Sequence, residues 1–274
     1  MSKLLVSEFI KSNSKLINDC FVKEPKILDK FNSLSKLNSL KTRLGIKLLI
    51  LYALLYLLLL EPEVVLYQLK LRKKSGLSGG YQFQRLYEIR RYIKSYKPKS
   101  VIEFGSGASS LLFAKYVDLV SVEESQEWLN KYKSDLDQTL FIRKSLKQKT
   151  IQSLYLYPRV ESIDELQEKV SSYLLSETIR NHVFDFAYID GPTSWEQNKD
   201  LIGLIKDPYN SIPNTSILEL NSLPTVILID GRRATISYLL RSNKFLNYQI
   251  VLKGVYLKKS QVGPYHTILT RENS

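Results

Sequence analysis

The chain has few of the residues that form cross-links or bind zinc. Among its 274 residues there is one Cys (Cys20) and there are two His, so an intrachain disulfide framework and a cysteine-based zinc site are both excluded. A single Cys is compatible with a reducing compartment. The hydrophobic share of 44% and the charged share of 24% are those of an ordinary globular protein, which excludes global disorder, collagen and coiled coil. The length suits one large domain, or one domain with an appendage.

Positive charge is concentrated in the N-terminal quarter. The formal net charge is +13, and residues 1–74, with 14 Lys and Arg against 6 Asp and Glu, account for +8 of it. Such an asymmetry predicts an anionic partner near this part of the chain, either a membrane surface or nucleic acid. A basic face that is merely solvated explains the same charge, so the charge alone leaves the three interpretations open.

A long apolar run lies in the same quarter. Thirteen apolar residues follow without a break at 48–60, and the run extends back to Leu44 across Lys47. As a helix, residues 44–60 would be about 25 Å long, which is at the short limit for crossing a bilayer core of ~30 Å. Because such a helix is apolar all round, it must be buried in protein or in lipid.

Basic residues flank this run on both sides: Lys41, Arg43 and Lys47 precede or interrupt it, and Lys70, Arg72, Lys73 and Lys74 follow it. A spanning helix normally has unequal flanks, whereas two basic flanks suit a segment that lies on, or dips into, the cytoplasmic leaflet. The run begins too late for a cleaved signal peptide. We therefore expect a cytoplasmic, membrane-associated protein, with a helix buried inside the protein as the alternative.

A linker divides the chain into two parts. Residues 73–80, KKSGLSGG, are basic and rich in Gly and Ser, which is typical of a flexible connection. Residues 1–75 are predicted to form a helical, basic, membrane-associating segment, because apolar residues recur there at three- and four-residue spacing. Residues 76–274 are predicted to form the main domain.

From residue 81 the predicted elements alternate between helix and strand. Helices are expected at 81–96, 111–116, 125–133 and 234–241, short strands at 100–104, 118–122, 139–143, 184–189 and 225–229, and a closing hairpin of strands 248–257 and 265–270. Alternation of this kind indicates an α/β fold with a parallel sheet, to which the hairpin adds an antiparallel member.

A glycine-containing turn follows the first of these strands, in the sequence Glu103-Phe104-Gly105-Ser106-Gly107. Glycine there permits positive φ and lets a ligand touch the main chain. A dinucleotide fingerprint would place a third glycine where this chain has Ser110, so an NAD-dependent enzyme is disfavoured.

A carboxylate ends the next strand. Glu123 lies sixteen residues after Gly107, where an acidic side chain can accept hydrogen bonds from ribose hydroxyls. Taken alone, the glycine-containing turn could be an ordinary tight turn between a strand and a helix. Taken alone, the carboxylate could be a helix cap or a solvated turn residue. Their combination is more specific than either part.

The sequence VIEFGSGASS followed by LVSVEESQEWL resembles the class I S-adenosylmethionine-dependent methyltransferases. The likeness is to the branch with a VEHDPEW-like end of the second strand, FkbM-like and catechol O-methyltransferase-like, whose aromatic residue Trp128 matches. FDFAYIDGP and VILIDGRR are similar to the ends of its fourth and fifth strands. The resemblance covers residues 79–270 and implies a Rossmann-like sheet of seven strands in the order 3-2-1-4-5-7-6, with an N-terminal helical appendage outside it.

The resemblance implies S-adenosylmethionine as the cofactor. Carried over residue by residue, it places Glu103, Gly105, Ser106 and Gly107 around the methionine end and the ribose, and Glu123 on the ribose hydroxyls. Gly79, Gly80 and Tyr81 precede the first helix, where members of the family often close over the cofactor, although Gly-Gly is also ordinary linker sequence.

Asp190 and Asp230 end two strands that are predicted to be neighbours, at the carboxyl edge where ligands bind in such sheets. In catechol-type O-methyltransferases, carboxylates here hold Mg²⁺ together with an Asn. This chain has Gly231 at that position, so Mg²⁺ is only weakly supported and no metal ligands are assigned. Both carboxylates are candidate catalytic bases, and Asp190 is also a candidate cofactor contact. The alternative is that they cap the loops that follow.

Five further residues have less definite roles. Arg232 and Arg233 suit an anionic or sugar-phosphate acceptor, or else a solvated helix start. Trp195 suits stacking on the adenine or the acceptor, or anchoring of a loop. His182 and His266 are interpreted as structural, with a base role for His266 as the alternative.

The function predicted is methyl transfer to an oxygen, on a small-molecule or saccharide or lipid-linked acceptor at the cytoplasmic membrane face. One alternative is a nucleic-acid methyltransferase, which the net charge favours, although residues 190–193 read DGPT rather than an NPPY-like or DPPY-like tetrapeptide. The other is a non-catalytic membrane-interaction protein with a vestigial nucleoside-binding fold. The presence of Gly105, Gly107 and Glu123 argues against it.

Overall fold

The computed structural model describes residues 40–75, 81–130, 151–156, 158–163, 168–192, 212–252 and 266–271. The sequence predictions for Cys20, Gly79, Gly80 and Trp195 lie outside these residues. So do those for the side chains of Tyr81 and Arg233.

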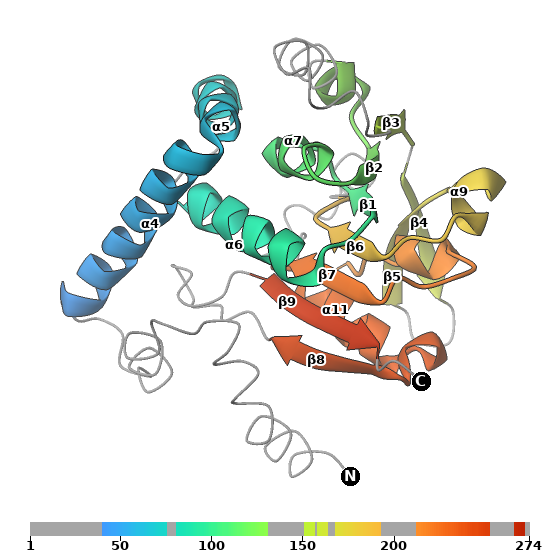
Figure 1. Cartoon of the computed structure of the whole chain (residues 1–274). Coiled ribbons are helices and arrows are strands. Elements are labelled where there is room, and N and C mark those ends of the chain that lie inside the picture. Colours follow the sequence, from blue (N-terminus) through green and yellow to red (C-terminus); the bar gives the residue numbers. More distant parts are fainter. Residues whose placement is uncertain are drawn as a thin grey trace.

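A seven-stranded mixed sheet forms the centre of the fold (Figure 1). Its order is β3-β2-β1-β6-β7-β9-β8, which, counted along the chain within this sheet, is the predicted 3-2-1-4-5-7-6. All pairs are parallel except β7 with β9 and β9 with β8, so the last two strands pair antiparallel as expected. The strands are β1 (Ser100–Phe104), β2 (Asp118–Glu123), β3 (Ile151–Tyr155), β6 (Phe186–Ile189), β7 (Val226–Asp230), β8 (Tyr248–Leu252) and β9 (His266–Arg271).

The third strand of the sheet is not the one that the sequence predicted. Its position is filled by β3, which pairs with β2 from Leu119↔Ile151 to Glu123↔Tyr155, whereas residues 139–143 lie outside the described residues. An edge strand pairs on one side only, and polar residues interrupt β3, so its sequence lacks the continuous apolar run of the central strands.

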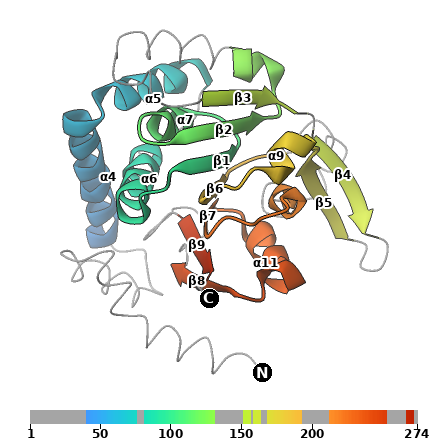
Figure 2. The ribbon, with the colours of Figure 1, turned by 45° about the vertical axis from the view of Figure 1, so that its right-hand side comes forward.

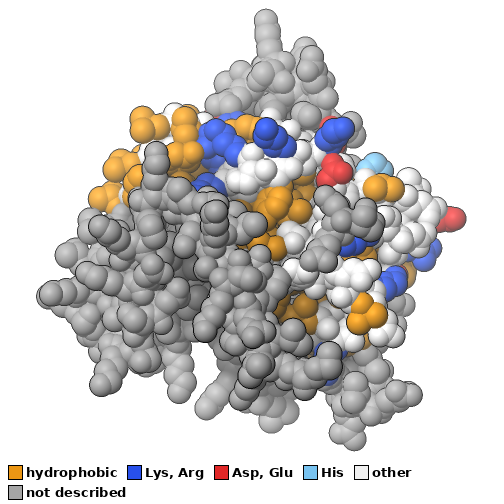
Figure 3. All heavy atoms as spheres, turned by 60° about the horizontal axis from the view of Figure 1, so that its bottom comes forward, with side chains coloured by type: hydrophobic (Ala, Val, Ile, Leu, Met, Phe, Trp, Pro, Cys, Tyr) orange, Lys and Arg blue, Asp and Glu red, His pale blue; other side chains and the backbone are white. Residues whose placement is uncertain are grey.

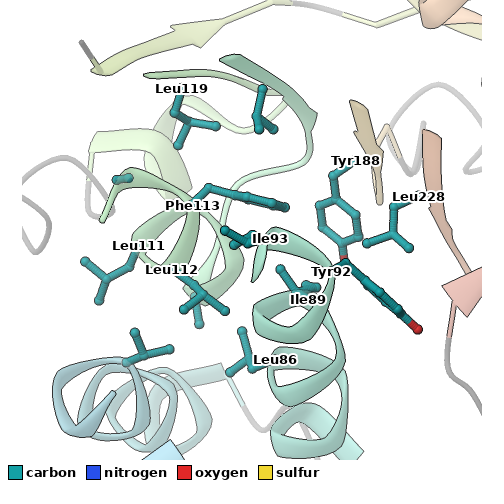
Figure 4. Close-up of a cluster of buried hydrophobic side chains, with 14 of the residues drawn as sticks. Leu86, Ile89, Tyr92, Ile93, Leu111, Leu112, Phe113, Leu119, Tyr188 and Leu228 are labelled. Atoms are coloured by element: carbon teal, nitrogen blue, oxygen red, sulfur yellow. The ribbon is translucent and has the colours of Figure 1, made fainter. Parts of the chain in front are cut away.

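Two helices, α6 (Tyr81–Tyr96) and α7 (Ala108–Ala114), lie on one face of the sheet, and α4 (Leu40–Leu60) and α5 (Pro62–Ser75) pack on their outer side (Figure 2). Their apolar side chains share one core with alternate residues of the strands, such as Val101 and Phe186. Figure 4 shows this core between α6 and α7, with Leu86, Ile89 and Ile93 on the first helix and Leu111, Leu112 and Phe113 on the second.

The opposite face is covered by α9 (Glu177–Asn181), α11 (Arg233–Arg241) and the separate hairpin of β4 (Pro158–Ile163) and β5 (Glu168–Tyr173). Two 3₁₀ turns, η3 (Ser216–Glu219) and η4 (Asn243–Phe245), complete this layer. The strand residues that alternate with the first set point here, and Phe104 stacks on Tyr173 with ring centroids 6.0 Å apart. Burial on both faces explains why most residues of the central strands are apolar.

The apolar run predicted as a helix at 44–60 lies in α4. One side of α4 packs against α6 and buries Ala53 and Leu57, whereas Leu51, Leu55 and Leu59 on the other side are exposed. The helix therefore satisfies the expectation of burial in protein along one side only. Within the described ranges, no helix has both the length and the apolar character needed to cross a membrane.

The helices before the predicted linker are joined to the core. Val64, Val65 and Leu71 of α5 are buried in the same cluster as Leu86 of α6 and Leu112 of α7. The division of the chain at residues 75 and 76 remains a prediction, and it separates helices that share this core.

Candidate functional site

The candidate site lies at the carboxyl ends of β1, β2, β6 and β7. From β1 the chain continues to β2 on one side, and it later returns to β6 on the other side. Ligands bind at such a point in open α/β sheets, because the loops leave in opposite directions there. The glycine-containing turn and both candidate aspartates lie at this edge.

Gly105 begins the turn after β1 in a conformation that only glycine adopts easily. Its φ is +98°, and its N–H donates a 2.7 Å hydrogen bond to the carbonyl oxygen of Val122. A Cβ on Gly105 would lie 2.9 Å from the backbone nitrogen of Gly191. The turn therefore packs directly against the segment after β6, and both the positive φ and the close approach require glycine.

Gly107 has a different role. Its φ is 176°, an extended conformation open to any residue, and a Cβ placed on it would meet no atom within 4 Å. Its N–H donates to the hydroxyl of Ser110 at 2.9 Å. Ser110, which stands where a dinucleotide fingerprint has its third glycine, therefore caps the turn. The open space beside Gly107 leaves room for a ligand against the main chain.

Glu123 ends β2 next to this turn. One carboxylate oxygen accepts hydrogen bonds of 2.9 Å from both the N–H and the hydroxyl of Ser106, and the other accepts one of 2.9 Å from the N–H of Ser125. Burial raises the pKa of Glu123, while the hydrogen bonds from Ser106 and Ser125 oppose that rise. The structure thus joins two parts of the predicted cofactor site, which are 17 residues apart.

Trp128 supports the turn from the side. Its indole N–H donates a 2.9 Å hydrogen bond to the carbonyl oxygen of Ser106, and its ring packs against the core beneath the helices. The aromatic residue of the resemblance is therefore in direct contact with the turn.

Glu103 lies beneath the turn and is fully buried. Its two carboxylate oxygens accept hydrogen bonds from the hydroxyls of Ser109 at 2.6 Å and Ser121 at 2.9 Å. Burial raises the pKa of Glu103 to about 7, although these hydroxyls oppose the rise. Its direct contact with a cofactor, which the resemblance implies, remains a prediction.

Asp190 directly follows β6 and Asp230 ends the neighbouring strand β7. The side chain of a third residue connects the two. The guanidinium of Arg85, on α6, forms ion pairs with both carboxylates. Arg85 also donates through Nε to the hydroxyl of Tyr188 at 2.9 Å, and that hydroxyl donates to Asp230 at 3.3 Å. The side chain of Asp190 is 35% exposed and that of Asp230 only 6%, so Asp190 is the member that a bound molecule can reach.

The surroundings of the two carboxyl groups shift their pKa values in opposite directions. Burial raises the pKa of Asp190, but the guanidinium groups of Arg85 and Arg232 outweigh it and lower the pKa overall. Burial also raises the pKa of Asp230; the charge of Arg85 opposes that rise, but burial together with the charge of Asp190 outweighs it and raises the pKa to about 8. The accessible carboxyl is thus favoured as the ionised one, and the buried one as the holder of a shared proton.

The residues at this edge do not fit a magnesium ion. A cation, the Arg85 guanidinium, already pairs with both carboxylates, and Gly231 offers no side-chain oxygen. In the part of the chain that the structure describes, no group of three or more His, Cys, Asp or Glu is placed to hold a metal.

Sequence reasoning missed Arg85 and Asn214. Arg85 lies in a predicted amphipathic helix, in which no local pattern marks it. Asn214 is buried and donates to the carbonyl oxygen of Gly191, while its own carbonyl accepts a 2.8 Å bond from the N–H of Ser216. It thereby holds Gly191, the residue after Asp190.

The remaining predicted residues are distributed around the site. Arg232 is buried and donates to the carbonyl oxygen of Pro192 at 2.8 Å, so it is not a solvated helix start. His266 is fully buried against Glu88, with 2.9 Å between Nδ1 and the carboxylate, and burial lowers its pKa. His182 is exposed and precedes β6, at the opposite edge from the site.

No protein-family model matches the chain, and no curated protein matches it. The chain is similar to solved structures of methyltransferases at low sequence identity. A methyltransferase of Podospora anserina bound to SAH is 13% identical over 77% of this chain and 88% of its own, with a TM-score of 0.45. An O-methyltransferase of Bacillus cereus in complex with SAH is 13% identical over 79% and 94%, with a TM-score of 0.43. The O-methyltransferase TomG of Streptomyces achromogenes in complex with SAM is 12% identical over 80% and 95%, with a TM-score of 0.44.

Proposed function

We propose that this chain is an S-adenosylmethionine-dependent methyltransferase that methylates an oxygen of its acceptor. The observation that carries the proposal is the direct connection between the glycine-containing turn and Glu123, beside the open space at Gly107. In this assignment Glu123 accepts hydrogen bonds from the ribose hydroxyls, while Gly105, Ser106 and Gly107 let the cofactor approach the main chain. Glu103 supports them from below.

The acceptor would lie beside Asp190. As the acceptor oxygen attacks, its bond to the methyl carbon forms and the sulfur–methyl bond breaks, which leaves S-adenosylhomocysteine. The hydroxyl proton passes to the carboxylate of Asp190, which is accessible and favoured in its ionised form. Asp230, which favours its protonated form, is the alternative base only when it is ionised. The cofactor arrives already activated, so alignment is the protein's main contribution.

The first experiment is calorimetric titration of the full chain with S-adenosylmethionine and S-adenosylhomocysteine. Glu123→Gln keeps one oxygen that Ser106 can bind, but the NH2 group that replaces the other oxygen cannot accept from a ribose hydroxyl. Loss of hydrogen bonds to a charged group predicts a Kd about 10- to 100-fold higher in this variant. Glu127→Gln, an exposed carboxylate four residues away, is the matched control and should bind as the wild type does. A folded wild-type chain that binds neither compound would refute the proposal.

We further propose that the exposed side of α4 and α5 holds the enzyme on the cytoplasmic face of a membrane, near a saccharide or lipid-linked acceptor. Figure 3 shows hydrophobic side chains gathered at the edge where α4 lies, with Lys and Arg side chains beside them. An apolar patch with a basic border favours an anionic lipid surface. The patch consists of Leu51, Tyr52, Leu55, Leu58, Leu59, Leu60, Leu66 and Leu69.

Co-sedimentation with vesicles tests this surface. The full chain should bind vesicles of phosphatidylglycerol and phosphatidylethanolamine more strongly than vesicles of phosphatidylcholine, and high salt should weaken that binding. Leu55→Ser with Leu59→Ser removes two leucines that are 52% and 82% exposed and should lower the partition coefficient by about tenfold or more. Leu246→Ser, at a leucine that is 79% exposed after α11, is the control. Equal sedimentation of all three proteins would refute the membrane face while leaving the methyltransferase proposal intact.

A further inference from the structure

Arg85 lies between the two aspartates of the site, and the proposed reaction gives it no role. Its guanidinium pairs with Asp190 and Asp230 together, although these two residues come from different strands and Arg85 comes from a helix on the face of the sheet. Two carboxyl groups this close are stabilised by a cation between them, by a shared proton, or by both. In this chain a side chain provides the cation.

Arg85 is held in place from several directions. Its Nε donates to Tyr188 at 2.9 Å and its Nη1 donates to Gln82 at 3.2 Å, while its side chain is only 13% exposed. The ring of Tyr188 lies 5.8 Å from the guanidinium carbon. Leu86 and Ile89 on the same helix are buried in the core, which fixes the helix that carries Arg85. The guanidinium is therefore a built part of the site.

We propose that Arg85 acts as a resident cation in place of a divalent metal ion, and that it excludes such an ion from the carboxylate pair. A guanidinium keeps its charge over the whole working pH range and presents several donors in a fixed plane. Arg85 is then a positioning residue: it keeps Asp190 ionised and aimed at the acceptor oxygen. This role in catalysis rests on the proposed function, whereas the exclusion of metal does not.

Titration of the full chain with Mn²⁺, followed by calorimetry and by the electron paramagnetic resonance signal of free Mn²⁺, tests the inference without cofactor or acceptor. The wild type should show no site with a Kd below about 1 mM, the weak end of carboxylate sites. Arg85→Ala leaves the pair without its cation and should bind one Mn²⁺ at least about tenfold more tightly. That site should disappear in Arg85→Ala combined with Asp230→Asn. Arg85→Lys keeps a cation and should behave as the wild type.

Arg91→Ala is the control on the same helix, and circular dichroism shows that each variant is folded. One Mn²⁺ bound by the wild type and lost in Asp230→Asn would overturn the inference, because a metal would then displace Arg85. A folded Arg85→Ala that gains no site would overturn it as well, since the guanidinium would then not be what excludes the metal. Failure of cofactor binding would refute the proposed function and leave these metal titrations unaffected.

Discussion

The side chain of Arg90, on α6, donates a 2.6 Å hydrogen bond to the carboxylate of Glu61, which is fully buried at the corner between α4 and α5. The same carboxylate also pairs with Lys115 and accepts from the hydroxyl of Tyr116. Burial raises the pKa of Glu61, but the hydrogen bonds from Lys115, Tyr116 and Arg90 outweigh it and lower the pKa overall. One residue thus ties the N-terminal helices to α6 and to the end of α7.

Glu61→Ala should strongly destabilise the protein. The substitution leaves the buried groups of Arg90 and Lys115 without their common carboxylate, and loss of one partner of a buried ion pair costs about 3–5 kcal/mol. The free energy of unfolding from a urea titration measures the loss. Glu127→Ala, at an exposed glutamate, should stay within about 0.5 kcal/mol of the wild type. If both variants were equally stable, the cluster around Glu61 would contribute nothing to the fold.

Removal of residues 1–75 should leave a chain that does not fold cooperatively. The fragment 76–274 would expose the faces of α6 and α7 that Leu57, Val64 and Leu71 cover in the intact protein. We expect binding of the dye ANS and a broad thermal transition, as for a loosened core. A soluble fragment with a sharp transition would instead support a domain boundary at residues 75 and 76.

The central sheet was predictable because its strands carry local signals. β1, β6 and β7 are short, mostly apolar runs that end in, or are followed by, Gly or Asp, and their order follows from the resemblance together with right-handed crossovers. β3 was missed because polar residues interrupt its edge-strand sequence. The predicted turn and Glu123 lie together because each ends one of two paired strands.

The partners at the site were not predictable in the same way. Arg85 on α6 and Tyr188 on β6 are 103 residues apart in the sequence. No local spacing in the sequence indicates that a residue of this helix contacts a residue of that strand. The resemblance marked Asp190 and Asp230 as a pair that could hold a metal. Only the tertiary structure shows that a guanidinium pairs with both of them.

Substitutions at the two glycines of the turn should separate stability from binding. Gly105→Ala places a side chain at φ +98° and 2.9 Å from Gly191, and strain of this kind costs about 1–3 kcal/mol. Gly107→Ala meets no atom within 4 Å and should stay within about 0.5 kcal/mol of the wild type. Its methyl group enters the proposed cofactor space, however, and should raise the Kd for S-adenosylmethionine by about tenfold or more, which corresponds to ~1.4 kcal/mol.

Urea titration and calorimetry on the two glycine variants provide the measurements. The proposed cofactor position predicts a stable Gly107→Ala protein that binds poorly. A Gly107→Ala protein with unchanged affinity would show that the cofactor does not pass this side of the turn. A Gly105→Ala protein as stable as the wild type would contradict the packing of the turn against Gly191.

Glu103 should make the protein less stable as the pH rises. Burial raises its pKa to about 7 from the ordinary value of 4.5, so between these values the unfolded chain releases a proton that the folded chain keeps. The stability from this group is fully present below about pH 4.5 and is lost as the pH rises through about 7.

Glu103→Gln does not titrate and escapes this loss. From pH 5 to pH 8, the free energy of unfolding of the wild type should fall relative to the variant by roughly 2–3 kcal/mol. Urea titrations of both proteins at each pH, with Glu127→Gln as the exposed control, measure the difference. A difference between wild type and Glu103→Gln that stays constant with pH would mean that Glu103 is ionised throughout, and that its environment beneath the turn is more polar than full burial implies.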